Sequence, residues 1–421
     1  MDELNQLKAL DKELVAASKN IKVLSAFAWD SSLQQPFIEN WQRGKATLPD
    51  VHYPKTDHSQ SMVQLDSIAT RASALEHPLG NYLKETALSY LSVARMIASL
   101  GTPQMTELSI NIYGRPGQPL TGGDGTTSVD AAEYFLAVGS EFYHNNALHE
   151  ADYCITADTV RNEIESGLVT VFRENEVSVV IDSHLASKAA AGARRIRLRD
   201  ATHFSVYDAE QLLQHEAFVH SLTALNGRRQ PVISAMGLGA PRTTAAQEGL
   251  ATFAELVTGA IDIARLERIA MRIIATDMAL GGADFFDVFR YFVEADQPHV
   301  ESFNSTMRIF RGAPLTGGHA FTKDAVYLRG MLEVHTFFRW AFKEQKLRLC
   351  NHFFAGRMTL GDVIKYEEFF HDNTLVEPRY LPPWMTRTTG LAGYLAFSVF
   401  ANSINLTSLD TQHDFGETVV V

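Results

Sequence analysis

The sequence predicts a mainly α-helical α+β fold, with a small β-sheet just before a helix that carries candidate metal ligands. Three observations support this fold class. Apolar residues repeat at helical spacing over most of the chain, and strand character is confined to residues 177–198. The motif His215-Glu216-Ala217-Phe218-Val219-His220 then lies within a long helical pattern. With 421 residues, 46% of them hydrophobic, the chain can bury a large core in one domain or in two lobes.

The N-terminal part is expected to begin with a helix. Leu7, Leu10 and Leu14 recur at helical spacing within the first 30 residues. Residues 40–60 are polar and contain two prolines, which indicates a loop or a boundary. We therefore divide the chain into an N-terminal helical segment with its loop, residues 1–60, and a main domain, residues 61–421.

Two short stretches carry the strand pattern. Residues 177–181 form a β-branched run, and residues 195–199 alternate strictly between arginine and an aliphatic residue. Because side chains alternate between the two faces of a strand, the three arginines share one face while Ile196 and Leu198 point to the core.

The two histidines of the motif stand at positions i and i+5. On an ideal helix of 3.6 residues per turn they would lie roughly 140° apart, whereas the i, i+4 pair of the familiar metalloprotease motif is about 40° apart. A π-bulge absorbs one extra residue and brings the two faces together. The spacing therefore predicts a local distortion of the helix between His215 and His220.

A second glutamate follows on what is expected to be the next helix. Asn226-Gly227 is expected to end the first helix, and Thr244 with Gln247 matches a capping box that opens the second. Glu248 then falls in the first turn, and Gly249 leaves room for close approach to an ion.

Histidine and glutamate in this arrangement fit a hydrolytic zinc site. Zinc takes imidazole and carboxylate ligands, and a catalytic site keeps one position open for water. We expect His215, His220 and Glu248 to bind Zn²⁺, and Glu216 to accept a proton from the attacking water. The alternative is a helix with two unrelated histidines, since 15 histidines make a chance match a real risk.

Composition excludes some classes of protein. A formal net charge of −12 argues against a nucleic-acid-binding surface. Cys154 and Cys350 form no disulfide framework and are expected to be buried or idle thiols. We find neither a signal-peptide pattern nor a run of 18 apolar residues, so a cytoplasmic protein without membrane association is expected.

The motif and its surroundings resemble a known family. The pentapeptide Gln247-Glu248-Gly249-Leu250-Ala251 resembles that of the bacterial QEGLA-motif proteins, named as flavohaemoglobin-expression modulators, which are similar to the catalytic domain of microtubule-associated tyrosine carboxypeptidases. Three further stretches look like the same family: residues 191–199, Phe310-Arg311-Gly312, and residues 321–330. The resemblance implies a zincin-like metallopeptidase with His215, His220 and Glu248 as zinc ligands and Glu216 as the catalytic base.

The resemblance also suggests where a peptide would bind. Tyr327 lies in a family-like stretch and is our candidate donor to the oxyanion, although a packed tyrosine is an equal alternative. In zincins an edge strand borders the cleft, and residues 195–199 are expected to form it. A carboxypeptidase also needs a cation for the terminal carboxylate, while a solvated surface charge is the simpler explanation for any single residue. The candidates are Arg194, Arg195, Arg308, Arg311 and Lys323.

The function that follows is a zinc-dependent carboxypeptidase acting on a peptide or protein C-terminus, of the tyrosine type by resemblance. The alternatives are an endo- or dipeptidyl metallopeptidase and a regulatory protein that binds a peptide or partner at a zinc site. The net negative charge argues against the acidic tail of tubulin as a substrate. The oligomeric state and the preferred residue do not follow from the sequence.

Overall fold

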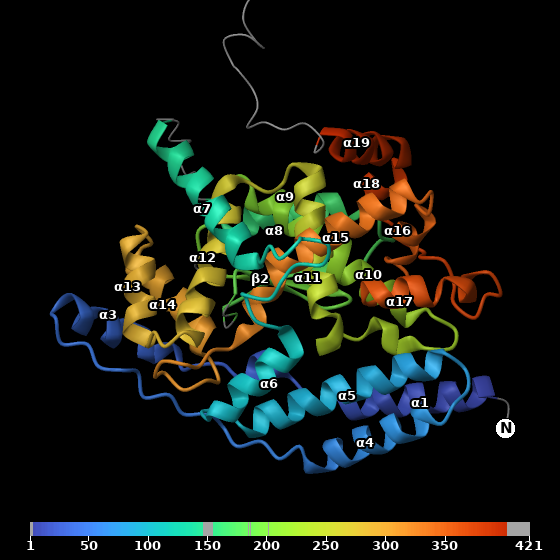
Figure 1. Ribbon diagram of the computed structural model, residues 1–421, viewed down its shortest axis with the longest axis horizontal. Coiled ribbons are helices and arrows are strands. Elements are labelled where there is room, and N and C mark those ends of the chain that lie inside the picture. The colour runs from blue at the N-terminus through green and yellow to red at the C-terminus, as the bar shows by residue number, and fades with distance from the viewer. Residues whose placement is uncertain (1–2, 146–154, 184, 186, 201, 402–421) are drawn as a thin grey trace, which may run out of the picture.

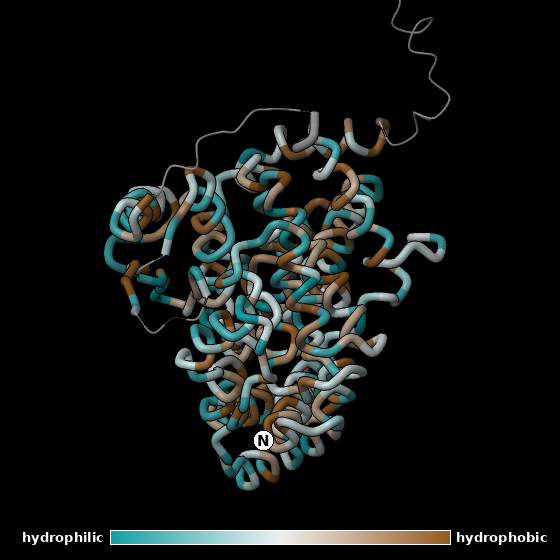
Figure 2. The backbone as a smooth tube through the Cα atoms, turned by 90° about the vertical axis from the view of Figure 1, so that its left-hand side faces the viewer, coloured by the Kyte–Doolittle hydropathy of each residue, from teal (hydrophilic) through white to brown (hydrophobic). Residues whose placement is uncertain are grey.

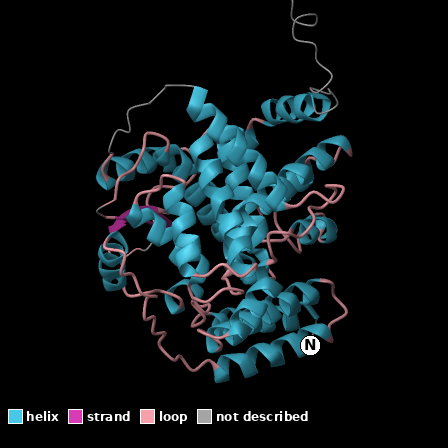
Figure 3. Ribbon diagram, turned by 60° about the vertical axis from the view of Figure 1, so that its left-hand side comes forward, coloured by secondary structure: helices cyan, strands magenta, loops and turns pink. Residues whose placement is uncertain are grey.

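The protein is mainly helical, as predicted, and its described residues form one three-stranded sheet, seen at the left edge of Figure 3. The computed structural model describes residues 3–401 apart from 146–154, 184, 186 and 201. Hydrophobic segments run through the stacked helices, and several outer loops are hydrophilic (Figure 2). No helix in the described part of the chain is long and apolar enough to span a membrane.

The N-terminal helices form a layer along one end of the molecule (Figure 1). The predicted first helix is present, and Leu7, Leu10 and Leu14 are buried on its inner face. They belong to a core cluster that continues through the metal-motif helix to Leu395, so this helix packs into the main body. The division of the chain at residue 60 stays a prediction. The layer consists of α1 (Glu3–Ser18), α4 (Ser59–Ser73), α5 (Leu79–Ala98) and α6 (Pro103–Tyr113).

The centre of the molecule is built from a continuous helical run and the two helices that pack against it. The elements are α9 (Asp208–Leu212), η2 (Leu213–Ser221), α10 (Leu222–Arg228), α11 (Thr244–Thr258) and α15 (Val326–Lys343). α11 lies against both η2 and α15, so residues far apart in sequence meet along it.

A second core cluster is rich in phenylalanine. Phe37 and Phe289 have ring centroids 5.0 Å apart, and Phe37 and Phe303 lie 5.3 Å apart. This cluster joins α3 (Gln34–Gln42), α13 (Phe285–Glu294) and α14 (His299–Phe310) to α12 (Ile263–Leu280). α12 also packs against α7 (Ser128–Asn145) and against η5 (Thr322–Ala325).

The sheet has the strand order β1-β3-β2. β3 (Arg195–Arg199) lies in the middle, parallel to β1 (Ser178–Asp182) and antiparallel to β2 (Ala189–Ala191). Ile196 and Leu198 are fully buried, which confirms the predicted alternation. The prediction that residues 195–199 form an edge strand was wrong, because the three-residue strand β2, too short to recognise from its sequence, covers that edge.

The remaining helices are short or lie outside the two core regions described above. They are α2 (Val23–Ala26), α8 (Ala157–Leu168), α16 (Arg348–His352), α17 (Leu360–Lys365), α18 (Pro383–Thr386) and α19 (Thr388–Ala401), with single 3₁₀ turns η1 (Ser31–Leu33), η3 (Ser234–Gly237), η4 (Pro241–Thr243) and η6 (Glu367–Phe370).

Candidate metal centre

The helix distortion predicted from the histidine spacing is present. η2 is a π-helix that spans Leu213–Ser221 and therefore contains the whole motif. Its i→i+5 hydrogen bonding turns the chain less per residue than an α-helix does, which places His215 and His220 on the same side. Their ring centroids lie 4.8 Å apart with the planes at 85°.

The structure brings His215, His220 and Glu248 together. Nε2 of His215 lies 3.4 Å from Oε2 of Glu248, and Nε2 of His220 lies 3.6 Å from the same oxygen. Potential ligand atoms of the three residues all lie within 4.8 Å of one another. Ligands at about 2.1 Å from a tetrahedral zinc ion are roughly 3.4 Å apart, so this spacing fits the metal closely.

Glu248 reaches this site from α11, although not in the way the sequence suggested. The predicted capping box is wrong: Thr244 is already helical because the 3₁₀ turn η4 leads directly into α11, and no side chain caps the helix. Gln247 instead accepts a hydrogen bond of 2.8 Å from Thr223 of α10. Glu248 accordingly lies in the second turn, where it faces η2.

Gly249 serves the packing of two helices rather than the approach to an ion. A Cβ atom at Gly249 would collide with the backbone carbonyl of Gly330 on α15, and a Cβ at Gly330 would meet the carbonyl oxygen of Ala245. The two glycines let α11 and α15 cross closely. The preceding helix α10 ends at Arg228, one residue after the predicted stop at Asn226-Gly227. Gly227 also serves packing, because a Cβ atom at Gly227 would collide with the backbone of Met236.

Two charged side chains hold the ligands in position. Nδ1 of His215 lies 2.6 Å from Oε1 of Glu255, so its N–H donates to this carboxylate and Nε2 is left to face the site. Nζ of Lys323 donates to Oε1 of Glu248 at 2.9 Å, which leaves Oε2 facing both histidines. Glu255 is itself fully buried and is paired with Arg265 at 3.2 Å.

The ionisable groups of the site shift one another's pKa values. Burial alone would lower the pKa of His215, but its hydrogen bonds with Glu248 and Glu255 raise that pKa well above its usual range. Burial alone would raise the pKa of Glu248, but Lys323 and the two histidines hold it well below its usual range. Burial alone would also raise the pKa of Glu255, but Arg265 and His215 lower that pKa to about 2.

Glu216 has the freedom that a proton acceptor needs. Its side chain follows His215 directly on η2 and is 9% exposed. Within the described residues it makes no hydrogen bond or ion pair, and its charge acts on His215. A carboxylate in this setting can take a proton from a water beside it.

Further cations surround Asp324, the residue that follows Lys323. Nε and Nη2 of Arg308 donate to the two carboxylate oxygens of Asp324 at 2.9 and 2.8 Å. Arg272 and Arg311 also interact electrostatically with Asp324. We call Arg272, Arg308, Arg311 and Asp324 the buried ionic cluster.

Tyr327 connects this cluster to the metal ligands. Its hydroxyl is within hydrogen-bonding reach of Arg308, and Nζ of Lys323 lies 5.2 Å from the centroid of its ring. Lys323 in turn binds Glu248. Three of the sequence-predicted substrate residues, Arg308, Arg311 and Lys323, are therefore brought together with Tyr327.

Arg194 and Arg195 lie elsewhere. Both are exposed at the start of the central strand β3. Both β2 and β3 contact η2, and Ser221 of η2 donates a hydrogen bond of 2.7 Å to the carbonyl of Gly192, directly after β2. Because Gly192 and Lys188 bond to β3, the alternation of an antiparallel ladder turns the main-chain groups of Ala189 and Ala191 to the open edge.

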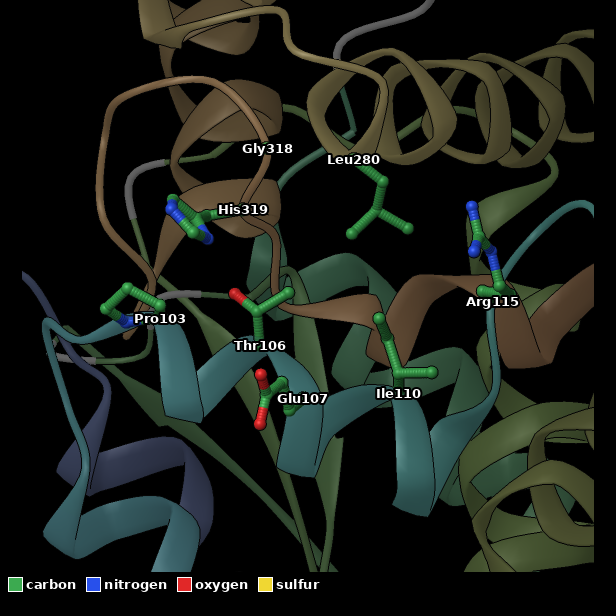
Figure 4. A pocket seen from close by; sticks show the side chains of 8 residues that line it. All are labelled: Pro103, Thr106, Glu107, Ile110, Arg115, Leu280, Gly318 and His319. Atoms are coloured by element: carbon green, nitrogen blue, oxygen red, sulfur yellow. The ribbon is translucent and has the colours of Figure 1, made fainter.

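His319 lines a separate cavity of about 270 Å³ between α6, the end of α12 and the loop before η5 (Figure 4). Thr106 and Ile110 of α6 and Leu280 of α12 also line it, but none of the metal ligands does. Cys350 is buried and free, as predicted, and Cys154 lies outside the described residues.

The sequence interpretation missed Glu255, Arg265 and Arg272. A signal was present: Glu255 follows Glu248 by seven residues, and Arg272 follows Arg265 by seven, so each pair shares a helix face. The sequence does not show that Glu255 of α11 contacts Arg265 of α12 and His215 of η2, because these contacts form only in the folded chain.

The fold and the site define a class of protein: a mainly helical protein that gathers two histidines and a glutamate beside a free carboxylate, as hydrolytic metal centres do. The family described as microtubule-associated tyrosine carboxypeptidase matches residues 36–403. The chain belongs to this family, which confirms the predicted similarity to these catalytic domains and points to a carboxypeptidase-type enzyme. A comparison with curated proteins found no match.

Proposed function

We propose that the protein is a zinc-dependent carboxypeptidase that removes the C-terminal residue of a peptide or protein. The observation that carries this proposal is the convergence of His215, His220 and Glu248 next to the unpaired carboxylate of Glu216. A purely structural zinc site closes with a fourth protein ligand and needs no free carboxylate. Among the described residues, His215, His220 and Glu248 are the only group of three or more potential ligands close enough to hold a metal ion.

Each residue of the site would have its own role in hydrolysis. Zinc, when bound by His215, His220 and Glu248, would supply a Lewis acid that polarises the scissile carbonyl and acidifies water. Glu216 would accept the proton of the attacking water and deliver it to the leaving amine. Tyr327 would donate to the oxyanion; in support, Nζ of Lys323, which binds Glu248, lies 5.2 Å from the centroid of its ring.

The substrate backbone has a binding edge available. The outward main-chain groups of Ala189 and Ala191 can pair with an extended peptide as an added strand. Only one of these groups is engaged within the described residues, because Ser187 donates to the carbonyl of Ala189 at 2.7 Å. The role first assigned to residues 195–199 would thus pass to β2.

The charge near the site changes one expectation about the substrate. The net charge of −12 argued against an acidic protein tail, yet the side chains around Tyr327 carry more positive than negative charge. Local potential rather than net charge governs what enters a cleft. An acidic C-terminus ending in tyrosine therefore becomes a reasonable first substrate to test.

The test uses purified zinc-loaded protein and peptides that end in tyrosine with a free carboxylate, with released tyrosine measured by mass spectrometry. Glu216→Gln should reduce turnover by roughly 10²–10⁴-fold while one zinc ion stays bound. Glu301→Gln, at an exposed position of α14, is the matched control and should leave turnover unchanged. Protein that binds no zinc, or full turnover in Glu216→Gln, would contradict the proposal.

A further inference from the structure

The end of the metal-motif helix is held by an arginine from a distant part of the chain. Nη2 of Arg357 donates a hydrogen bond of 2.9 Å to the main-chain carbonyl of His220, and 137 positions separate the two residues. η2 ends at Ser221 and passes directly into α10, so this carbonyl lies at the junction of the two helices. The hydroxyl of Thr223 is 3.5 Å from the same oxygen but lies closer, at 2.7 Å, to the carbonyl of Val219.

The position of this junction matters for the metal ligands. If α-helical geometry began before His220, His215 and His220 would lie roughly 140° apart around the helix and could not share one ion. The amide of Leu222 donates to the carbonyl of Ala217, five residues earlier, and to that of Val219, three residues earlier. The hydrogen bonding therefore changes register here, and a fixed donor at the carbonyl of His220 stabilises the register that the metal site needs.

The backbone that carries Arg357 is itself fixed. Its amide donates to the carbonyl of Met236 in η3 at 2.7 Å, and its carbonyl accepts from the hydroxyl of Tyr82 in α5 at 2.9 Å. The side-chain amide of Asn226 in α10 donates to the nearby carbonyl of Phe354 at 2.8 Å. The arginine therefore reaches the metal-motif helix from a base that is bound to three other elements.

The guanidinium of Arg357 has no carboxylate partner. The side chain is partly exposed, but its Nε is buried without a hydrogen-bond acceptor, and it forms no ion pair within the described residues. Burial lowers the pKa of Arg357 below its usual range, while the charge of Glu248 acts in the opposite direction. A desolvated cation without a counter-charge costs stability, so packing alone does not favour an arginine at this position. Its bond to His220 gives it a role.

A glycine makes room for this guanidinium. A Cβ atom at Gly239 would lie 2.6 Å from Nη1 of Arg357, and the only other atom within 4 Å would be Cζ of the same arginine. Gly239 does not have a positive φ, so alanine fits the backbone there. Alanine at this position would therefore displace the guanidinium and little else.

We propose that Arg357 is a positioning residue of the metal centre, an inference that rests on the metal-binding part of the proposed function. Arg357 acts through the carbonyl of His220. It fixes the end of the π-helix and thereby directs the imidazole of His220, whose Nε2 lies 3.6 Å from Oε2 of Glu248. Each histidine is then held by a different element, since Glu255 of α11 holds the ring of His215.

Competition with a chromophoric chelator measures zinc affinity and tests this role. Arg357→Met should weaken zinc binding by about 10–100-fold, because the carbonyl of His220 loses its donor. Arg357→Lys keeps the charge and one donor and should recover part of the loss. Gly239→Ala leaves the arginine in the chain but moves its guanidinium, and it should weaken zinc binding in the same direction.

Two matched variants control for the loss of an arginine and of a glycine. Arg339 of α15 is also partly exposed with an Nε that is buried and unpaired, but it makes no bond to the metal-motif helix. A Cβ atom at Gly393 of α19 would have no neighbour within 4 Å. Arg339→Met and Gly393→Ala should leave zinc affinity unchanged.

A spectroscopic measurement separates positioning from a general effect on stability. The visible absorption of the Co²⁺-substituted protein depends on ligand geometry, and it should change in Arg357→Met and Gly239→Ala but not in Arg339→Met. A lower melting temperature of Arg357→Met with unchanged zinc affinity and Co²⁺ spectrum would overturn the inference. Tighter zinc binding in Arg357→Met would overturn it too, because the arginine would then act only as a repelling charge.

The outcomes also separate this inference from the proposed function. Zinc binding without release of tyrosine would overturn the proposed function, and weaker zinc binding by Arg357→Met would still support the inference. If the wild-type protein binds no zinc, amide hydrogen exchange of the metal-free protein decides. Faster exchange over residues 217–225 in Arg357→Met than in Arg339→Met would support the hold on η2, and equal exchange would overturn it.

Discussion

Arginines occupy two contrasting regions of this molecule. On β3 they follow strict alternation, so Arg195 and Arg197 point to solvent while Ile196 and Leu198 fill the core. In the buried ionic cluster, Arg272 and Arg308 come from helices far apart in sequence and share one carboxylate. The outward positions of the sheet arginines are predictable from a pattern of five residues. The arginines around Asp324 cannot be predicted from such a pattern, because Arg272 of α12 and Arg308 of α14 meet this carboxylate only in the folded chain.

The largest expected difference between the two regions comes from removing a carboxylate. Asp324→Asn removes the buried counter-charge of Arg308, which also acts on Arg272 and Arg311, and should lower the free energy of unfolding by about 3–5 kcal/mol. Asp182→Asn, next to Arg197 on the sheet, should cost less than about 1 kcal/mol because this pair is solvated. Denaturant unfolding of both variants measures the difference. Equal losses of unfolding free energy in the two variants would show that burial does not make the Asp324 pair stronger than the Asp182 pair.

The stability that Asp324 contributes should depend on pH. The pKa of Asp324 is held below its usual 3.8 by the arginines around it, so its contribution to stability is complete above that value. This contribution to stability is lost as the pH falls from about 4 to below the pKa that Asp324 has in the folded protein. Wild-type unfolding should therefore become easier over this range, and Asp324→Asn should lose less stability over the same range.

Sequence reasoning succeeded where the determinants are local. The i, i+5 spacing of His215 and His220 was sufficient to predict the distorted helix, because one turn of backbone decides which residues share a face. It failed where the determinants lie between elements: the 3₁₀ turn before α11 replaced the expected capping box, and Gly249 proved to serve the crossing with α15. β2 escaped notice because three alanines carry no strand pattern of their own.

A smaller effect should follow from the second carboxylate of α11. Glu255→Gln removes the charge that orients His215 and should weaken zinc binding by about 10–100-fold, as the loss of such partners of metal-bound histidines usually does. Competition with a chromophoric chelator measures the affinity. Glu301→Gln, an exposed position of α14, controls for the loss of one negative charge. Unchanged affinity in Glu255→Gln would show that η2 alone orients the histidine.

The smallest effect is expected on the sheet, and it provides the baseline for the comparison. Arg197 and Asp182 are 3.4 Å apart with side chains 48% and 25% exposed, whereas Arg308 and Asp324 are 2.8 Å apart and 20% and 2% exposed. A double-mutant cycle of Arg197→Met and Asp182→Asn should give a coupling energy below about 1 kcal/mol, because water screens the pair. The same cycle at Arg308 and Asp324 should give a clearly larger value. If the sheet pair matched it, charge alone rather than burial would set the strength of these pairs.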